Sequence, residues 1–318
     1  MQSADTPFPP LLTLTLNPCV DVSYDVARLI EDQKVHANSN RLDPGGNGIN
    51  VARALKRLEI PAQACAVLGG EIGDLFTRLV KGEIDHLHSV RIDGETRINV
   101  TLQQQQPRAQ YEVSGIGPLL DAATLQHITE TVLLLTGSGF AVLTGSRMPG
   151  VPTDYYADLI HKLRAQGARA AVDAQGEFLE QAIAAKPFLI KPNRFELEQL
   201  LQRALPDVPA VIAAAQAVCA RGVDWVCVSL GSEGAVLAGA TQVYVGTAPS
   251  VVVVSTVGAG DSMVGGLISG LARGDAPAEA LRLALACGSG TAAQPGTELF
   301  DPVALPGLLR QIQIRLWP

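Results

Sequence analysis

The sequence has few aromatic residues and no excess of positive charge. Phe, Trp and Tyr make up 4% of its 318 residues, and the formal net charge is −7. A negative balance disfavours broad contact with nucleic acid or an anionic membrane, so we expect neither as a partner. No apolar run reaches membrane-spanning length, and the first residues, MQSADTPFPP, lack the charged and apolar regions of a signal peptide. We therefore expect a cytoplasmic protein.

Paired cysteines and several common catalytic motifs are also missing. The five cysteines are scattered without a CxxC pair, which favours buried thiols in a reducing compartment over disulfides or a metal site. The sequence contains no GxxxxGK[ST], no GxGxxG, no HExxH and no GxSxG. A kinase with this sequence is therefore neither a P-loop enzyme nor a protein kinase.

The pattern of apolar residues predicts an α/β protein. From about residue 120 onward, short apolar strands alternate with helix-length segments, as in βαβ units with a mostly parallel sheet covered on both faces. Two polar segments with alternating apolar positions, 22–42 and 89–113, do not suit such a buried sheet. We predict one doubly wound α/β domain over residues 1–318, with a small β-sheet lid formed by insertions at about 22–42 and 89–113. The last helix is expected near 302–315.

The segment STVGAGDSMVGG, residues 255–266, predicts a turn that leads directly into a helix. The VVVV run at 251–254 before it is typical of a buried strand. Gly258 and Gly260 on either side of Ala259 let backbone N–H groups converge at the positive end of the helix dipole. Asp261 lies beside this anion site, which suits phosphoryl transfer with Asp261 as the general base. The alternative is a glycine-rich turn whose aspartate caps the helix.

Other chemically capable residues follow predicted strands, where open α/β sheets bind ligands. They are Asp21, Gly45-Gly46, Ser146-Arg147, Asp173, Asn193-Glu196 and Ser229-Gly231. In PGGNGIN, a second glycine-rich helix start suits a phosphate or, through Asn50, sugar hydroxyls; it also suits a tight turn without a ligand. KPNRFELE fits a helix-capping box, or an Mg²⁺ site that reaches the ion through water. Lys34 and Arg97 on the predicted lid suit either a clamp on a phosphorylated substrate or solvated charges.

Together these segments resemble the PfkB (ribokinase-like) family of carbohydrate kinases. STVGAGDSMVGG is similar to the C-terminal signature of that family, and PGGNGINVAR to its N-terminal signature. The segments TLTLNPCVD, GETRINV, LTGS, KPNRFELE and VSLGSEGA lie in the family's order, so that the resemblance covers about residues 12–300. The forms TLNP, TRIN and STVGAGDS point to the phosphofructokinase and tagatose-6-phosphate kinase branch.

The resemblance implies roles for individual positions. Asp261 matches the catalytic base, with Gly258, Ala259 and Gly260 as the anion hole. The positions that match the sugar-phosphate side are Asp21, Lys34, Gly45, Gly46, Asn50, Arg97 and Ser146. The positions that match the Mg-ATP side are Asn193, Glu196, Ser229, Gly231 and Gly234, with Asn193 and Glu196 reaching the metal through water. The family's lid closes the site and pairs two subunits, which implies a homodimer.

The activity implied by the resemblance is ATP- and Mg²⁺-dependent phosphorylation of a fructose monophosphate to fructose 1,6-bisphosphate. It would be that of a 6-phosphofructokinase or a 1-phosphofructokinase. The alternatives are a tagatose-6-phosphate kinase and a non-catalytic sugar-phosphate-binding regulator with the same fold. A monovalent cation such as K⁺ is a further candidate cofactor, expected in the loop around Ser255, Val257 and Gly296. Three positions that depart from the family pattern bear on substrate identity: Asn47, Arg147 and Phe195.

Overall fold

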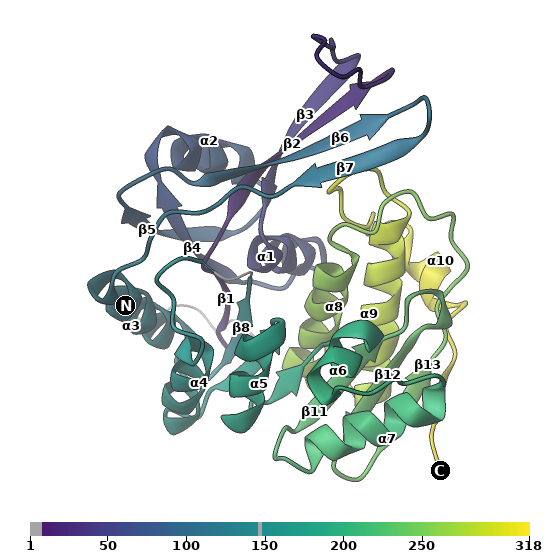
Figure 1. Cartoon of the computed structure of the whole chain (residues 1–318). Coiled ribbons are helices and arrows are strands. Elements are labelled where there is room, and N and C mark those ends of the chain that lie inside the picture. Colours follow the sequence, from purple (N-terminus) through teal and green to yellow (C-terminus); the bar gives the residue numbers. More distant parts are fainter. Residues whose placement is uncertain (1–7, 146–147) are drawn as a thin grey trace.

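The computed structural model describes residues 8–145 and 148–318 of the chain. A ten-stranded sheet runs through its centre (Figure 1). In spatial order the strands are β14 (Ile314–Leu316), β13 (Val243–Gly246), β12 (Ala235–Gly239), β11 (Trp225–Ser229), β10 (Leu189–Ile190), β9 (Arg169–Asp173), β8 (Phe140–Thr144), β1 (Leu11–Thr15), β4 (Gln63–Gly69) and β5 (His86–Ile92). The strands from β11 to β5 pair in parallel, and the three at the other end pair antiparallel.

Helices cover both faces of this sheet because successive side chains of each buried strand point to opposite sides. Leu12 and Leu14 of β1 pack with one set of helices, and Leu11 packs with the other. The first set is α3 (Ala122–Thr136), α4 (Tyr155–Ala165), α5 (Gly176–Ala184), α6 (Arg194–Leu201) and α7 (Val208–Cys219). The second set is α1 (Asn47–Arg57), α8 (Ala259–Arg273), α9 (Pro277–Ala292) and α10 (Leu305–Leu309). The doubly wound, mostly parallel α/β fold is thus confirmed.

The strand order reverses direction at β1. The chain runs from β1 to β4 and β5 on one side, and then from β8 to β11 on the other. Connections that diverge from neighbouring strands leave a crevice at the carboxyl ends of those strands, which is where open α/β sheets bind ligands. Here these ends are Thr15 and Thr144, which pair with each other.

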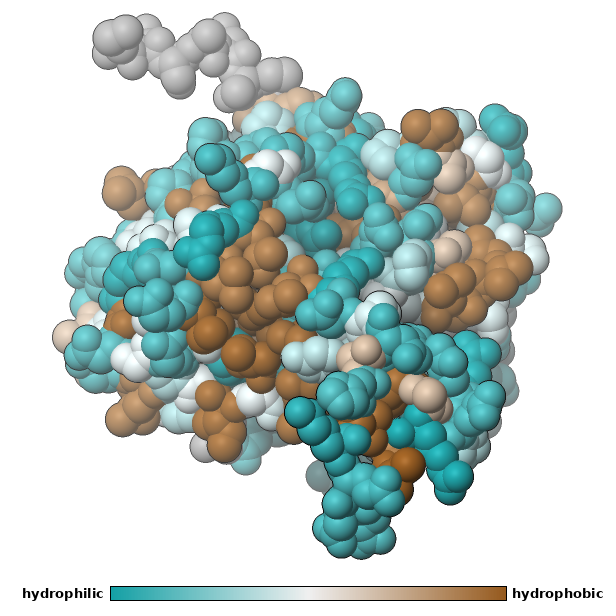
Figure 2. All heavy atoms as spheres, turned by 90° about the horizontal axis from the view of Figure 1, so that it is seen from above, coloured by the Kyte–Doolittle hydropathy of each residue, from teal (hydrophilic) through white to brown (hydrophobic). Residues whose placement is uncertain are grey.

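A separate four-stranded sheet projects above the carboxyl ends of the strands (Figure 1). Its order is β3 (Ser39–Gly45), β2 (Cys19–Val26), β6 (Arg97–Gln104) and β7 (Ala109–Val113). The face with Asp21 and Asn99 is polar, whereas Val20 and Val22 on the opposite face pack on helix α2 (Gly70–Val80). Farther along that apolar face Leu42 and other hydrophobic residues are exposed, and hydrophobic patches lie among hydrophilic ones on this end of the molecule (Figure 2).

The boundaries of this small sheet differ from the predicted segments. The stretch from 89 to 92 belongs to β5 and pairs in parallel with β4 in the large sheet. The second segment of the small sheet therefore begins at Arg97, while the first is longer than expected and runs from Cys19 to Gly45. Polar composition alone did not separate an edge strand of the large sheet from the strands of the small one.

Two expectations for the C-terminal part were wrong. Residues 251–254 form no strand, and the side chains of Val252 and Val253 are 83% and 61% exposed. The edge next to β13 is occupied instead by β14, which lies at the end of the segment predicted as a helix over 302–315. Only Leu305–Leu309 of that segment is helical. Within the described part of the chain, no helix has both the length and the apolar character needed to cross a membrane.

Candidate active site

The turn into α8 brings the backbone and the carboxylate of the GAGD segment together. Gly258 is the N-cap and has φ 75°, a left-handed conformation that glycine adopts at little cost. Helix α8 begins at Ala259, so the N–H groups of Gly260 and Asp261 lie in the first turn, where backbone donors have no intrahelical acceptor. The Ala259 N–H already donates to Thr256 O, at 3.3 Å. The helix start can therefore present the N–H groups of Gly260 and Asp261 to an anion, whereas the N–H of Ala259 is already engaged.

Asp261 is buried, with 7% of its surface exposed. Burial and the nearby Asp173 raise the pKa of the Asp261 carboxyl to about 7, while the hydrogen bond from Asn50 and the charge of Lys191 act in the opposite direction. The Asn50 Nδ2 group donates to Asp261 Oδ2 at 2.8 Å. A base is most effective when its pKa lies near the working pH, and this carboxyl meets that condition.

A buried ion pair faces the same helix start. Lys191 follows β10 and Asp173 ends β9, with 3.4 Å between Lys191 Nζ and Asp173 Oδ1. Burial by itself lowers the pKa of Lys191, but Asp173 and the other acids around it outweigh that effect, so the pKa is raised and the ammonium stays charged. A Cβ placed on Gly260 would lie 3.4 Å from Lys191 Nζ. The positive charge is thus adjacent to the backbone donors of α8.

Lys191 was missed by sequence reasoning, although it stands in the KPNRFELE segment. Its signal is its position directly after the apolar residues Leu189 and Ile190, where an unpaired lysine would be costly. Asp173 was noted only as a strand-end residue. The parallel pairing of β9 with β10 is what brings the two together.

The start of α1 packs tightly over the ends of β1 and β8. A Cβ on Gly48 would lie 2.6 Å from Leu14 O, and Gly46 has φ 122°, so neither position accepts another residue without movement. A Cβ on Gly45 would collide with the carboxylate of Asp21. These contacts explain the glycines of PGGNGIN, and they bring Asn50 to the α8 helix start.

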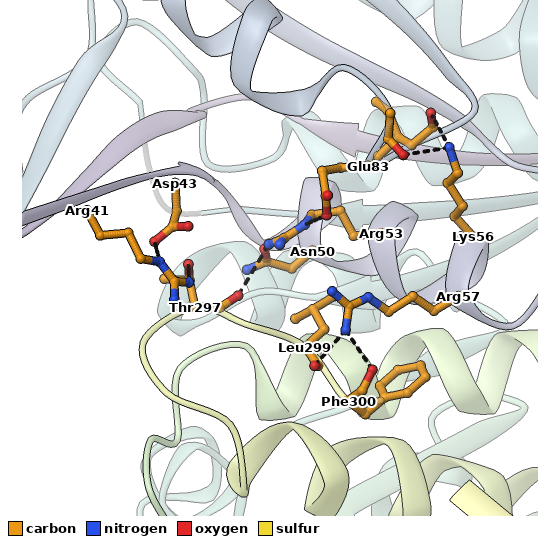
Figure 3. A network of polar contacts seen from close by, with 12 residues as sticks. Arg41, Asp43, Asn50, Arg53, Lys56, Arg57, Glu83, Thr297, Leu299 and Phe300 are labelled. Atoms are coloured by element: carbon orange, nitrogen blue, oxygen red, sulfur yellow. Dashed lines mark hydrogen bonds and ion pairs between the residues drawn. The ribbon is translucent and has the colours of Figure 1, made fainter. Parts of the chain in front are cut away.

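Behind Asn50, a network of arginines joins α1 to the loop at 296–300 (Figure 3). Arg53 Nη1 donates to Asn50 Oδ1 and to Thr297 O, both at 3.3 Å, and Arg53 Nε lies 3.3 Å from Glu83 Oε2. One turn later, Arg57 Nη1 donates to the carbonyls of residues 299 and 300. From β3, Arg41 Nη2 donates to Thr297 Oγ1 at 3.4 Å. The loop is therefore attached to both α1 and the small sheet.

A cleft of about 320 Å³ lies between the polar face of the small sheet and the starts of α1 and α8. Asp21, Gly46, Asn50, Arg97 and Asp261 all line it. Its volume falls within the range of small-molecule sites. Four of the predicted sugar-side residues, from three separate segments, thus meet around one cavity, and the predicted base forms part of its wall.

Three side chains contribute to the polar character of the cleft next to the small sheet: Asp21, Asn99 and Arg97. Asn99 Nδ2 donates to Asp21 Oδ1 at 2.9 Å, and burial raises the pKa of Asp21 against the hydrogen bonds from Cys19 and Asn99. Arg97 donates only to carbonyls among the hydrogen bonds found in the described residues, those of Asn17 and Gly115. Its charge is therefore available to an anionic group in the cleft. Asn99 was missed, although it stands two residues after Arg97 in TRIN.

The other sugar-side and neighbouring positions do not share one location. Lys34 is exposed in the turn between β2 and β3 and does not line the cleft. Ser146 and Arg147 lie outside the described residues. Asn47, at the first position of α1, lines the cleft.

On the predicted nucleotide side, Asn193 and Glu196 form the capping box of α6. The Asn193 side chain accepts from Glu196 N, and Glu196 Oε2 accepts from Asn193 N, both at 2.8 Å. Glu196 Oε1 accepts from Gln175 Nε2 at 2.7 Å. Phe195, which is 66% exposed, and Glu196 line a second cavity of about 360 Å³ between α5 and α6.

The remaining nucleotide-side predictions lie at the end of β11. Ser229 pairs with Asn193, which joins the two halves of that side. Gly231 has φ 61° and open space around it, whereas Gly234 packs against the carbonyl of Gly246. The three residues named for a monovalent cation lie together. Ser255 Oγ donates to Gly296 O at 2.7 Å and accepts from Val257 N at 3.3 Å.

Comparison with known proteins identifies the family. The model of the "pfkB family carbohydrate kinase" matches residues 14–303. The chain belongs to the pfkB family of carbohydrate kinases. Among pfkB relatives, a 1-phosphofructokinase of Rhodobacter capsulatus is 36% identical and covers 97% of this chain and 98% of its own length. A tagatose-6-phosphate kinase of Staphylococcus epidermidis is 32% identical, with coverage of 96% and 99%.

A solved pfkB structure shows how far the architecture is shared. Phosphofructokinase-2 from Escherichia coli, in complex with potassium, has a TM-score of 0.90 at 32% identity and covers 95% of this chain and 98% of its own. The ribokinase-like fold and the phosphofructokinase and tagatose-6-phosphate kinase branch, both predicted from the resemblance, are confirmed.

Proposed function

We propose that the protein is an ATP-dependent sugar-phosphate kinase that phosphorylates a fructose monophosphate to fructose 1,6-bisphosphate. The observation that carries the proposal is the buried carboxyl of Asp261, which lies between a polar cleft lined by Arg97 and a helix start with a buried lysine beside it. The names of the related proteins, 1-phosphofructokinase and phosphofructokinase-2, favour a fructose phosphate. In this proposal the chain is one kinase domain, and the small sheet is its lid.

The roles of the residues follow from their chemistry. Asp261 removes the proton from the sugar hydroxyl, whose oxygen then bonds to the γ-phosphorus of ATP while the bond to the bridging oxygen of ADP breaks. Negative charge on the transferred group is stabilised by the N–H groups of Gly258 and Gly260 and by the Lys191 ammonium. Asp21 accepts hydrogen bonds from sugar hydroxyls, and Asn99 donates to them. Arg97 binds the phosphate that the sugar already carries.

The chain's residues fit the Mg²⁺ that accompanies ATP. This ion keeps several waters and takes few protein ligands, so a single carboxylate such as Glu196 in the first turn of α6, with Asn193 at the N-cap, is a sufficient donor set. When bound, Mg²⁺ supplies positive charge that offsets the charge of the phosphates. Both Glu196 oxygens already accept hydrogen bonds, which suits contact through water rather than direct ligation. Ser229 and Gly231 complete the nucleotide side.

A monovalent cation and a second subunit complete the proposal. The loop before α8 offers oxygen atoms as ligands, since Ser255 Oγ and the carbonyl of Gly296 lie 2.7 Å apart. The potassium complex of the related phosphofructokinase-2 supports K⁺ as the ion.

Leu42, Ile98 and Tyr111 are about 40% exposed or more on the apolar face of the small sheet. Covering them with the same face of a second copy would give a homodimer through the lid. We infer that it acts in the cytoplasm, where its five free cysteines stay reduced.

A coupled assay for ADP release tests the proposal. Wild-type protein with Mg-ATP should turn over at least one of fructose 1-phosphate and fructose 6-phosphate, and Asp261→Asn should lower kcat by at least about 1000-fold while substrate binding is kept. Asp158→Asn, an exposed carboxylate on α4, is the matched control and should retain wild-type kcat. Near wild-type turnover by Asp261→Asn would refute Asp261 as the base.

Tagatose 6-phosphate belongs in the same assay. The relative named tagatose-6-phosphate kinase aligns over 96% of this chain, so this sugar phosphate is the second candidate substrate. A kcat/KM higher with tagatose 6-phosphate than with either fructose phosphate would assign the activity to it. Binding of a sugar phosphate without release of ADP would instead identify a non-catalytic regulator.

A further inference from the structure

Arg53 is a buried charge close to the base that does not line the cleft. It lies on α1 one turn after Asn50 and is 5% exposed. Its ion pair with Glu83 offsets the cost of burying the guanidinium, and its Nη1 group reaches Asn50 Oδ1 and Thr297 O (Figure 3). Arg53 does not itself line the cavity, but its two hydrogen-bond partners there, Asn50 and Thr297, do. Its direct contacts therefore connect it to the cleft through Asn50 and the 296–300 loop.

The contact between Arg53 and Asn50 selects one orientation of the amide. An asparagine oxygen only accepts and its nitrogen only donates, while a guanidinium only donates. Arg53 Nη1 therefore holds Asn50 Oδ1 on its own side and leaves Nδ2 to face Asp261 Oδ2, at 2.8 Å. The flipped amide would place its oxygen against the carboxylate and its NH₂ group against the guanidinium. Both contacts of the flipped form are repulsive.

Resting on the kinase function proposed above, we infer that Arg53 is a positioning residue for the catalytic base. It locks the Asn50 amide so that a donor holds one oxygen of Asp261 and the other oxygen is presented to the sugar hydroxyl. Arg53 acts through Asn50 and takes no part in the transfer itself. The second bond of Nη1, to Thr297 O, keeps the guanidinium in place from the side of the loop.

The consequence is a change in the protonation of Asp261. The groups that face its carboxyl are Asn50 from α1, Asp173 from the end of β9 and Lys191 after β10; Arg53 and Glu83 lie behind Asn50. Asn50 and Lys191 lower the pKa of Asp261, whereas burial and Asp173 raise it. If the amide is free to turn away, one of the two lowering effects is lost. The base then becomes protonated at a higher pH, and activity on the acid side falls.

The pH profile of kcat/KM for Arg53→Met tests this inference. The acid limb should move upward by about 0.5 pH unit or more, which is roughly a threefold or greater loss well below the limb. Arg57→Met is the matched control, because Arg57 lies on the same helix and bonds to the same loop without contacting Asn50. Its acid limb should stay within about 0.2 unit of the wild type. The substrate phosphate titrates equally in every variant, so a difference in the acid limb between two variants comes from the protein. An unshifted limb in Arg53→Met overturns the inference.

A double-mutant cycle separates positioning from direct electrostatics. In the Asn50→Ala background, Arg53→Met should cause no further shift, since the amide it orients is gone. A shift of the same size in that background would mean that the guanidinium acts on Asp261 directly, and would also overturn the inference. If Arg53→Met fails to fold in a thermal melt, Arg53→Lys carries the same test, because it keeps the charge without the planar fork that reaches Asn50 and Glu83 together.

A readout that needs no turnover keeps the two proposals distinct. The carboxyl ¹³C signal of Asp261, identified by its loss in Asp261→Asn, reports its pKa in the free protein. That pKa should rise in Arg53→Met and stay unchanged in Arg57→Met. A wild-type protein that phosphorylates no sugar phosphate contradicts the proposed function, whereas an unchanged Asp261 signal in Arg53→Met contradicts only the role of Arg53.

Discussion

Replacing the Asp261 carboxylate, the proposed catalytic base, by its amide should stabilise the free protein at alkaline pH. Asp261 is buried, and burial with repulsion from Asp173 raises the pKa of its carboxyl from 3.8 to about 7. In Asp261→Asn the side chain keeps its shape and still accepts the hydrogen bond from Asn50. It carries no charge, so the cost of holding an ionised group in this site disappears.

The size and the sign of the effect follow from linkage between protonation and folding. Below about pH 4 the carboxyl is protonated in both states and there is no penalty. Between about pH 4 and 7 the unfolded chain ionises while the folded one stays protonated, so wild-type stability falls as pH rises. Above about pH 7 the penalty is complete, and a shift of about three pH units corresponds to roughly 4 kcal/mol. With an unfolding entropy of about 0.7 kcal/mol per kelvin for 318 residues, this is roughly 6 °C in Tm.

Thermal melts of the ligand-free protein at pH 5, 6.5 and 8, all at one scan rate, measure this gap. Asp261→Asn should exceed the wild type by about 3 to 6 °C at pH 8 and by much less at pH 5. Asp158→Asn, whose carboxylate is exposed and paired with Lys162, should show no such pH-dependent gain. The reasoning would be refuted if Asp261→Asn were no more stable than the wild type at pH 8. It would also be refuted if the difference in Tm between the two proteins did not change with pH.

Three further substitutions separate the remaining roles. Lys191→Met should lower kcat by at least about 100-fold, because a positive charge that stabilises the transition state is lost. It should also lower Tm, because Asp173 loses its buried partner. A kcat within threefold of the wild type in steady-state kinetics would show that Lys191 does not stabilise the transition state. Arg97→Ala should raise KM for the sugar phosphate by about 10- to 100-fold with little change in kcat, and an unchanged KM would contradict a phosphate contact. Gly258→Ala should lower both Tm and kcat, since its φ of 75° disfavours a side chain; Gly274→Ala, with φ 79° at the other end of α8 and open space around it, should lower Tm alone.

Much of the fold and site followed from local pattern. Alternating strand and helix segments predict the parallel sheet, and the glycines of PGGNGIN and STVGAGDS predict the starts of α1 and α8, because both signals depend only on neighbouring residues. The roles of Asp21, Asn50 and Asp261 came with the resemblance to the pfkB family, and all three line one cleft.

What was missed depended on distant segments. The valines at 251–254 have the composition of a buried strand, but they form none, and the strand that pairs with β13 is β14, close to the end of the sequence. Lys191 was not recognised because its partner, Asp173, lies on another strand. The polar residues 89–92 were assigned to the small sheet, whereas they belong to β5 of the large one, because composition does not reveal which strand a segment pairs with.

The sequence by itself determined that a glycine-rich helix start would carry an acid, since backbone conformation and dipole are local properties. Only the tertiary structure decided the surroundings and the protonation of that acid. Asn50 is 211 positions away from Asp261 in the chain, and Arg53 is 244 positions from the carbonyl of Thr297 that it holds. Burial, the opposing charges of Asp173 and Lys191, and the oriented amide set the protonation of Asp261, and none of these exists until the chain has folded.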